Sequence, residues 1–282
     1  MTNEQFNAGS DDGNSKDSLS ADSLNQPEPM SIETVMPKFD GKKWWQLSHL
    51  RKLSAYIFIV ALTSCNNGYD GSVLNSLYTM PNFNHAIGNV DSAVLGALTN
   101  GYVFGCFVSC FINSWVIDKF GRKPGIQIGN IIMIIGVIIQ SCAGVWEKSF
   151  PSDYTGRNVL GMLIGARVVL GFGAGIIQVA APSLISELSF PTHRSTSTAY
   201  YNSSWYLGAI VAAWVSYGTR NMANNWCWRV PVIVQGFFPF VQSCLLLFMV
   251  DESPRFLVSK GKLEEAKKVL SKNHGGGYPG SE

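Results

Sequence analysis

The sequence contains little charge: Asp, Glu, Lys and Arg make up only 14% of its 282 residues, and the formal net charge is +2. Such a balance excludes the strongly basic surface that binds nucleic acid. The six cysteines form no C-x-x-C pair, and Cys106 and Cys110, four residues apart, have no histidine nearby. We interpret the cysteines as small apolar side chains, and we expect no metal and no cofactor.

Groups that perform chemistry in enzymes are equally scarce in the apolar part of the chain. The four histidines, His49, His85, His193 and His274, all lie outside the long apolar runs. No nucleophile stands in a pattern that would pair it with a base. We therefore expect that the protein is not an enzyme.

The first 37 residues also lack an apolar core, being rich in Asp, Glu, Ser, Asn and Pro. This composition is typical of disorder, and we expect no cleavable signal peptide in it. We predict a disordered cytoplasmic tail over residues 1–52, a transmembrane domain over 53–251 and a cytoplasmic loop segment over 252–282.

Long apolar runs are what the sequence has in abundance. A helix needs about 20 apolar residues to cross a bilayer core, and six segments meet this requirement: 54–78, 92–116, 126–146, 158–182, 195–217 and 230–250. The second, third and sixth contain no charged residue. The pattern predicts an all-α integral membrane protein with six transmembrane helices in the lipid bilayer.

Glycines recur at four-residue intervals on two of these segments. They are Gly101/Gly105 on the second, and Gly161/Gly165 and Gly171/Gly175 on the fourth. This spacing lets helix backbones approach closely in lipid, so it predicts a packed bundle.

Lysines and arginines are distributed unevenly between the loops. They precede the first segment, fill the loop between the second and third, and follow the sixth, whereas residues 79–91 contain none. Because Lys and Arg favour the cytoplasmic side, we predict that both termini are cytoplasmic.

Two charged residues lie deep within predicted spans, Asp70 on the first and Arg167 on the fourth. At 1.5 Å per residue they lie about 12 and 13 Å from the outer ends of their spans, so they are natural partners. One interpretation is a static ion pair that fixes the packing. The other is a proton switch, because burial disfavours a charged carboxylate and a nearby guanidinium favours it.

Acids and arginines also gather at three predicted cytoplasmic helix ends. Together with a turn glycine they are Asp118, Gly121, Arg122, Glu187, Arg194, Glu252 and Arg255. Singly, each cation serves as an anchor under the positive-inside rule. Jointly, charge-assisted pairs among them form a cytoplasmic gate that breaks when the inner face opens.

These motifs, in this order, resemble the sugar porter family of the major facilitator superfamily. The patterns are D-x-x-G-R-K from Asp118, R-x-x-x-G-x-G-x-G from Arg167, P-x-x-x-x-E from Pro182 and E-S-P-R from Glu252. The resemblance covers about residues 50 to 272. Further motifs are most similar to the fungal lactose permease-like and hexose transporter branch: Gly68-Tyr69-Asp70-Gly71, Tyr201-Asn202, Trp205-Tyr206 and Gly208.

The resemblance implies a role for individual residues. Asp70 matches the carboxylate of proton-coupled members, and Arg167 matches its partner. Asn202 matches a sugar-binding amide of the fifth helix, although an interhelical hydrogen bond explains it equally well without the resemblance. Trp205, one turn further, offers an apolar face to a sugar ring.

The resemblance also implies that the chain is an N-terminal half. Family members have twelve spans and hold the sugar between two six-helix halves, each a 3+3 inverted repeat. We therefore expect proton-coupled symport of a disaccharide or hexose in the plasma membrane. A second half would come from a partner chain, a second copy of this chain or a longer product. The alternative is a truncated, non-transporting remnant or a sugar-sensing membrane protein. Asp251, where the family carries proline before E-S-P-R, is a small departure.

Overall fold

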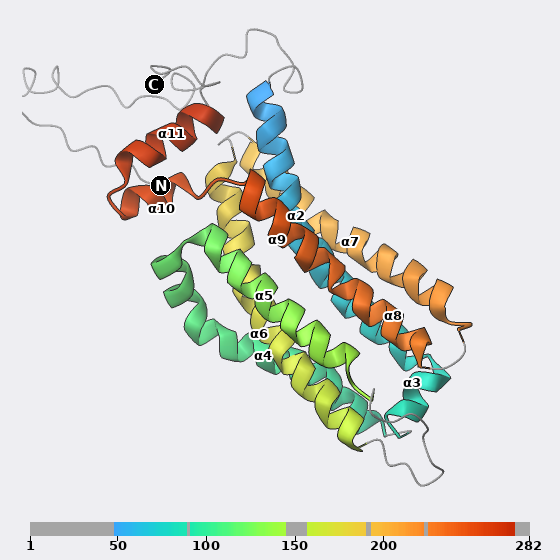
Figure 1. The fold of residues 1–282 in the computed structure, drawn as a ribbon. Helices are drawn as coiled ribbons and strands as arrows, with labels where there is room; N and C mark the ends of the chain where they lie inside the picture. The colour runs from blue at the N-terminus through green and yellow to red at the C-terminus, as the bar shows by residue number, and fades with distance from the viewer. Residues whose placement is uncertain (1–47, 89–90, 145–156, 190–192, 223–224, 274–282) are drawn as a thin grey trace, which may run out of the picture. The chain divides into compact units, whose positions relative to one another are not determined.

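The computed structural model describes residues 48–88, 91–144, 157–189, 193–222 and 225–273. All of the elements in these ranges are helices, and they belong to the unit that spans Trp44–Glu282 (Figure 1). Residues 1–47 of the predicted tail lie outside the described residues. The first described helix begins at Ser48, before the predicted boundary at residue 52.

Each of the six predicted spans corresponds to a helix, the last of them divided at Gly236. Their bounds are α2 Ser48–Tyr78, α4 Ser92–Phe120, α5 Arg122–Ser141, α6 Arg157–Leu188, α7 Arg194–Thr219, and α8 Trp226–Gln235 with α9 Phe237–Met249. Three short helices were not among the predicted spans: α3 Pro81–Ala86, α10 Pro254–Ser259 and α11 Leu263–Asn273.

Four of the helices are long and apolar enough to cross a membrane: Ser92–Phe120, Arg122–Ser141, Asn158–Leu188 and Trp226–Met249. The sequence analysis assigned this length and hydropathy to all six segments, and the first and fifth have the length but not the hydropathy. Helices α2 and α7 are long enough, at 31 and 26 residues, but their mean hydropathy is lower because amides and hydroxyls interrupt them. Many of these polar groups face other helices or a pocket described below.

Helices α2 and α7 cross at glycines. A Cβ added at Gly68 of α2 would lie 1.9 Å from the carbonyl oxygen of Trp205, and one added at Gly208 of α7 would lie 1.8 Å from that of Cys65. No side chain fits at either distance. The two backbones are therefore in direct contact, as small residues permit in membrane bundles.

Helices α4 and α6 cross in the same way. A Cβ at Gly171 of α6 would lie 2.0 Å from the carbonyl oxygen of Tyr102, and one at Gly105 of α4 would lie 2.1 Å from that of Val168. Along the chain, Gly171 follows Gly68 by the same interval as Gly208 follows Gly105. The α2–α7 crossing thus recurs as the α6–α4 crossing, which is the internal repeat expected of three helices followed by three related ones.

The glycine pattern predicts this packing only in part. Gly105 and Gly171 lie at the contact, and a Cβ at Gly175 would lie 1.9 Å from the hydroxyl oxygen of Ser109. Gly161 and Gly165 face open space, with no atom within 4 Å of an added Cβ. Spacing alone does not say which face of α6 meets a neighbour.

Short helix α3 closes the end of the bundle where α2 ends. Phe83 of α3 is 1% exposed and packs edge-on against Trp228 of α8, with ring centroids 5.8 Å apart. Leu77, Leu98 and Leu163 belong to the same buried apolar cluster. Helix α3 thus ties α2, α4, α6 and α8 together.

After the bundle, α10 and α11 form a helical pair. Leu263, Ala266 and Leu270 stand at helical spacing on α11. Ala266 is buried, but Leu263 and Leu270 remain exposed. Lys272 Nζ lies 2.6 Å from Asp251 Oδ2, and this hydrogen bond raises the pKa of Lys272.

Candidate functional site

Asp70 and Arg167 meet in the interior of the bundle. Arg167 Nη1 donates to Asp70 Oδ1 at 2.7 Å, and each residue is only 2% exposed. A Cβ added at Gly101 of α4 would lie 3.5 Å from Arg167 Cβ, an ordinary van der Waals contact, so α4 packs against the arginine stem. The expected pairing is therefore present in the structure, between α2 and α6.

Sequence reasoning missed a third member of this site, Gln235 at the end of α8. Its Nε2 donates to the same Asp70 Oδ1 at 2.5 Å, and the side chain is fully buried. Arg167 Nη2 and Gln235 Oε1 are buried and bond to no described residue. The available signal was a polar amide in an otherwise apolar segment without charge, which lipid disfavours unless the side chain has a partner.

A pocket of about 410 Å³ opens between α2, α6 and α7. Its lining residues are Ser64, Asn67, Gln178, Pro182, Thr198, Tyr201, Asn202 and Trp205. The two residues predicted to bind sugar, Asn202 and Trp205, thus lie in one pocket, and Trp205 is 41% exposed. The lining combines amides and hydroxyls with aromatic rings and contains no charged residue. Such a surface offers donors and acceptors to neutral hydroxyl groups.

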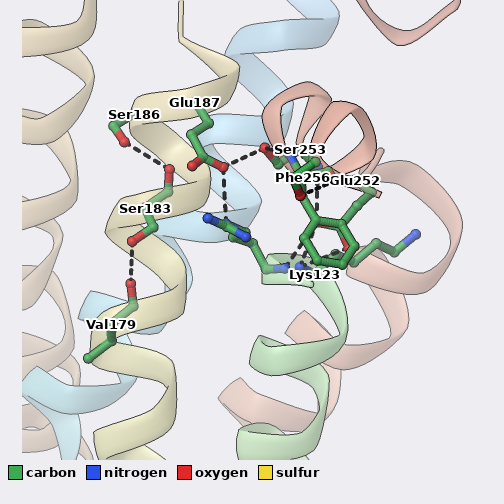
Figure 2. A network of polar contacts seen from close by, with 10 residues as sticks. Lys123, Val179, Ser183, Ser186, Glu187, Glu252, Ser253 and Phe256 are labelled. Carbon is green, nitrogen blue, oxygen red and sulfur yellow. Dashed lines mark hydrogen bonds and ion pairs between the residues drawn. The ribbon is translucent and has the colours of Figure 1, made fainter. Parts of the chain in front are cut away.

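A second polar site joins the start of α5, the end of α6 and the segment between α9 and α10 (Figure 2). Arg122 Nε lies 3.2 Å from Glu187 Oε2, and both side chains are largely buried. Ser253 Oγ donates to the same carboxylate, so Glu187 faces both the start of α5 and the start of α10. We call Arg122, Glu187, Glu252 and Ser253 the helix-end cluster.

Glu252 caps α5 from a distance in the chain. Its Oε1 accepts hydrogen bonds from the backbone N–H groups of Arg122 and Lys123 at 3.1 and 3.2 Å. These groups belong to the first turn of α5, where they have no partner within the helix and where the helix dipole favours an anion. Gly121 makes the approach possible: its φ is 109°, and an added Cβ would lie 2.7 Å from Glu252 Oε2.

Three residues of the expected cytoplasmic gate are not part of the cluster. Asp118, Arg194 and Arg255 are exposed, and none of their side chains forms an ion pair within the described part of the chain. Of the charge-assisted pairs expected among these helix ends, the described residues thus form the one between Arg122 and Glu187.

The arrangement of these helices defines the class of protein. The fold matches the xylose transporter XylE of E. coli in a partially occluded, inward-open conformation, with a TM-score of 0.70 at 21% identity. The match covers 80% of this chain and 56% of that protein. This is the major facilitator fold, of which the described helices form one six-helix half.

The chain belongs to the sugar transporter family. The family described as "Sugar (and other) transporter" matches residues 56–279. The sugar transporter STL1 of Saccharomyces cerevisiae is 32% identical over 83% of this chain and 42% of its own length. The H(+)/hexose cotransporter 1 of Parachlorella kessleri is 31% identical over 64% of this chain and 31% of its own. The chain thus spans about two fifths of the first of these relatives and is an integral membrane protein.

Proposed function

We propose that this chain forms the proton-coupling half of a sugar symporter. The observation that carries the proposal is the buried pair of Asp70 and Arg167, whose atoms lie 2.7 Å apart at 2% exposure. Charges are expensive inside a membrane protein and are retained mainly for function. A similar relative, the H(+)/hexose cotransporter 1, carries proton coupling in its name.

In this proposal, proton coupling follows because the Arg167 guanidinium and a proton compete for the Asp70 carboxylate. In the described state the carboxylate accepts hydrogen bonds from Arg167 and from Gln235. A movement of α6 against α2 that draws the guanidinium away leaves a buried carboxylate, which then takes up a proton. Protonation and helix movement therefore favour one another, as alternating access driven by a proton gradient requires.

The pocket between α2, α6 and α7 supplies this half's share of the sugar site. Asn202 offers a donor and an acceptor to sugar hydroxyls, and Trp205 offers a ring face to the apolar side of a pyranose. Both lie on α7, next to the crossing at Gly68 and Gly208. A change of the α2–α7 contact would therefore move the pocket and the coupling carboxylate together. The substrate class is a hexose or a disaccharide.

The helix-end cluster acts as the latch of the cytoplasmic side. Arg122, Glu187 and Glu252 connect α5, α6 and the segment before α10. Opening the inner face separates these elements, and the charge-assisted bonds break as it opens. In this proposal the helix-end cluster and both termini lie on the cytoplasmic side, which the distribution of lysine and arginine favours, and the membrane is the plasma membrane.

The remaining half of the transporter comes from a longer product that contains this chain, from a partner chain or from a second copy. Labelled hexose and disaccharide uptake in transport-deficient yeast tests the proposal. We expect little uptake from the chain alone and proton-dependent uptake from a product that includes the second half. Robust proton-dependent uptake by a monomer of this chain would contradict the half-transporter assignment.

Two substitutions in the complete transporter distinguish proton coupling by Asp70 from sugar binding by Asn202. Asp70→Asn is expected to abolish accumulation against a gradient and to spare sugar exchange, because exchange needs no net proton movement. Asn202→Ala is expected to raise the sugar KM at least several-fold, with Ser203→Ala, the adjacent exposed residue, as the control. Unchanged uphill transport in Asp70→Asn would remove Asp70 from the mechanism.

A further inference from the structure

The buried face of α2 carries three polar residues near the middle of the helix. Thr63, Asn66 and Asp70 follow one another at helical spacing, and they are 1%, 1% and 2% exposed. Residues spaced by three and four positions share a face of a helix. None of the three lines the sugar pocket, which Ser64 and Asn67 reach from the neighbouring face.

Helices α8 and α9 oppose this face with two glutamines. Gln235 donates to Asp70, and Gln242 donates to Thr63 Oγ1 at 2.6 Å and to the carbonyl of Ile59 at 3.1 Å. Seven residues separate the two glutamines, as seven separate Asp70 from Thr63. Both intervals correspond to about 10 Å of helix, so two polar levels lie stacked along one interface.

Helix α5 contributes the third side. Asn66 Nδ2 donates to Met133 Sδ at 3.4 Å. Asn130, one turn nearer the helix-end cluster, is fully buried, and neither its Nδ2 nor its Oδ1 bonds to any described residue. One further turn along, Gln127 Nε2 donates to Ser243 of α9. We call Gln127, Asn130, Met133, Thr63, Asn66, Gln235, Gln242 and Ser243 the polar seam.

The seam is rich in buried polar atoms that lack a partner. Besides both polar atoms of Asn130, these are the side-chain oxygens of Asn66, Gln127, Gln235 and Gln242. An unpartnered buried amide is costly, and such groups in folded proteins are bonded to protein or to ordered water. Six orphaned atoms along one interface, contributed by α2, α5, α8 and α9, indicate a common ligand that both donates and accepts.

We propose that the polar seam binds a chain of buried water molecules between α2, α5 and α8–α9, which leads from Asp70 toward the helix-end cluster. Water satisfies both the orphaned oxygens and the orphaned Asn130 Nδ2, whereas a cation would leave the latter unpaired. About four waters at hydrogen-bond spacing cover the 10 Å from Asp70 to Thr63.

The seam also gives a proton a route separate from the sugar pocket, an extension that rests on the proposed function. Protonated Asp70 passes its proton to the nearest water, and each water in turn passes one on along the chain. A proton leaves at the far end, and the carboxylate that remains is paired again with Arg167. Sugar and proton would then leave Asp70's neighbourhood by different paths.

Hydration of the seam is measured on this chain itself, purified in detergent. Radiolytic labelling in ¹⁸O-water oxidises side chains next to bound water, and methionine is a sensitive reporter. Met133 is 1% exposed and lies in the seam, whereas Met80 is 4% exposed and lies in an apolar cluster. We expect Met133 to be labelled several-fold faster than Met80. Equal or slower labelling of Met133 would overturn the proposal.

Substitution of Asn130 gives an independent test. If the seam is dry, Asn130→Leu removes an unpaired amide and raises the thermal midpoint. If it is hydrated, the variant displaces water, lowers the midpoint and cuts the labelling of Met133 several-fold. Asn130→Ser, which keeps a polar group, is expected to retain most of the labelling and serves if the leucine variant fails to fold. A raised midpoint with unchanged labelling contradicts the water chain.

The proton route is tested separately in the complete transporter. Asn130→Leu is expected to slow uphill accumulation several-fold and to leave sugar exchange unchanged. If Asn130→Leu loses the labelling of Met133 but leaves uphill accumulation unchanged, the proton route is overturned and the hydration of the seam is not. Unchanged accumulation in Asp70→Asn overturns the proposed coupling instead, and it leaves the hydration result standing.

Discussion

Replacement of Arg167 with methionine removes the guanidinium and keeps an unbranched apolar stem. Asp70 then remains buried, held by Gln235 alone. The side chains of the pair are 2% and 3% exposed, so the range for buried rather than surface pairs applies. Breaking such a pair from one side costs about 3–5 kcal/mol. For a chain of this size, that lowers the thermal midpoint by roughly 6–20 °C.

The double variant Asp70→Asn with Arg167→Met distinguishes an uncompensated charge from lost packing. Both charges are absent, and the asparagine keeps its bond to Gln235, so we expect the double variant to recover most of the midpoint lost in Arg167→Met. An exposed pair serves as the control: Lys262 and Glu265 are 56% and 58% exposed. We expect Lys262→Met to change stability by less than about 1 kcal/mol.

Thermal unfolding of the detergent-solubilised chain, followed by tryptophan fluorescence, measures these three variants and the single variant Asp70→Asn. The reasoning fails if Arg167→Met shifts the midpoint no more than Lys262→Met does. It also fails if the double variant is as unstable as the sum of the two single variants, because the cost would then come from packing alone.

Three smaller predictions use the same measurement. Gly171→Val forces a side chain into the backbone of α4 and is expected to lower the free energy of unfolding by about 3 kcal/mol or more. Gly165→Val on the same helix, where the space is open, is expected to change stability little. Equal effects would show that the crossing is not a tight contact. Gly121→Ala combines backbone strain with a clash against the Glu252 carboxylate. It should therefore destabilise the protein more than Gly261→Ala, because Gly261 has φ 75° and open space around it. The reverse order would contradict the capping of α5 by Glu252. The acidic partner of Lys272 raises its pKa above the ordinary 10.5, so its contribution, about 0–1 kcal/mol for an exposed pair, is complete below pH 10.5 and declines above it. A Lys272→Met variant should accordingly lose less stability than the parent between pH 10 and 12, and identical pH profiles would contradict this.

The sequence alone predicts the helix bundle and the charged pair inside it. Long apolar runs predict membrane helices because lipid offers no partner to a polar backbone, and they locate all six long helices. Asp70 and Arg167 were paired correctly because charges of opposite sign at one depth have few alternatives in an apolar interior. The roles of Asp70, Arg167, Asn202, Trp205 and the helix-end residues remain proposals.

Only the tertiary structure decided which residues of a repeated type are in contact. The spacing of Gly161 and Gly165 equals that of Gly171 and Gly175, yet only the latter pair meets a neighbouring helix. Arg122 and Arg194 look alike in sequence, yet one pairs with Glu187 and the other stays in solvent. In the sequence, Gln235 and Asn130 are isolated amides within apolar segments, and only the packing of the helices places them at one interface. The reason is the same in each case: hydropathy sets which segments leave water, but the face that each presents depends on how the helices rotate and cross, and that is determined by contacts between residues far apart in the chain.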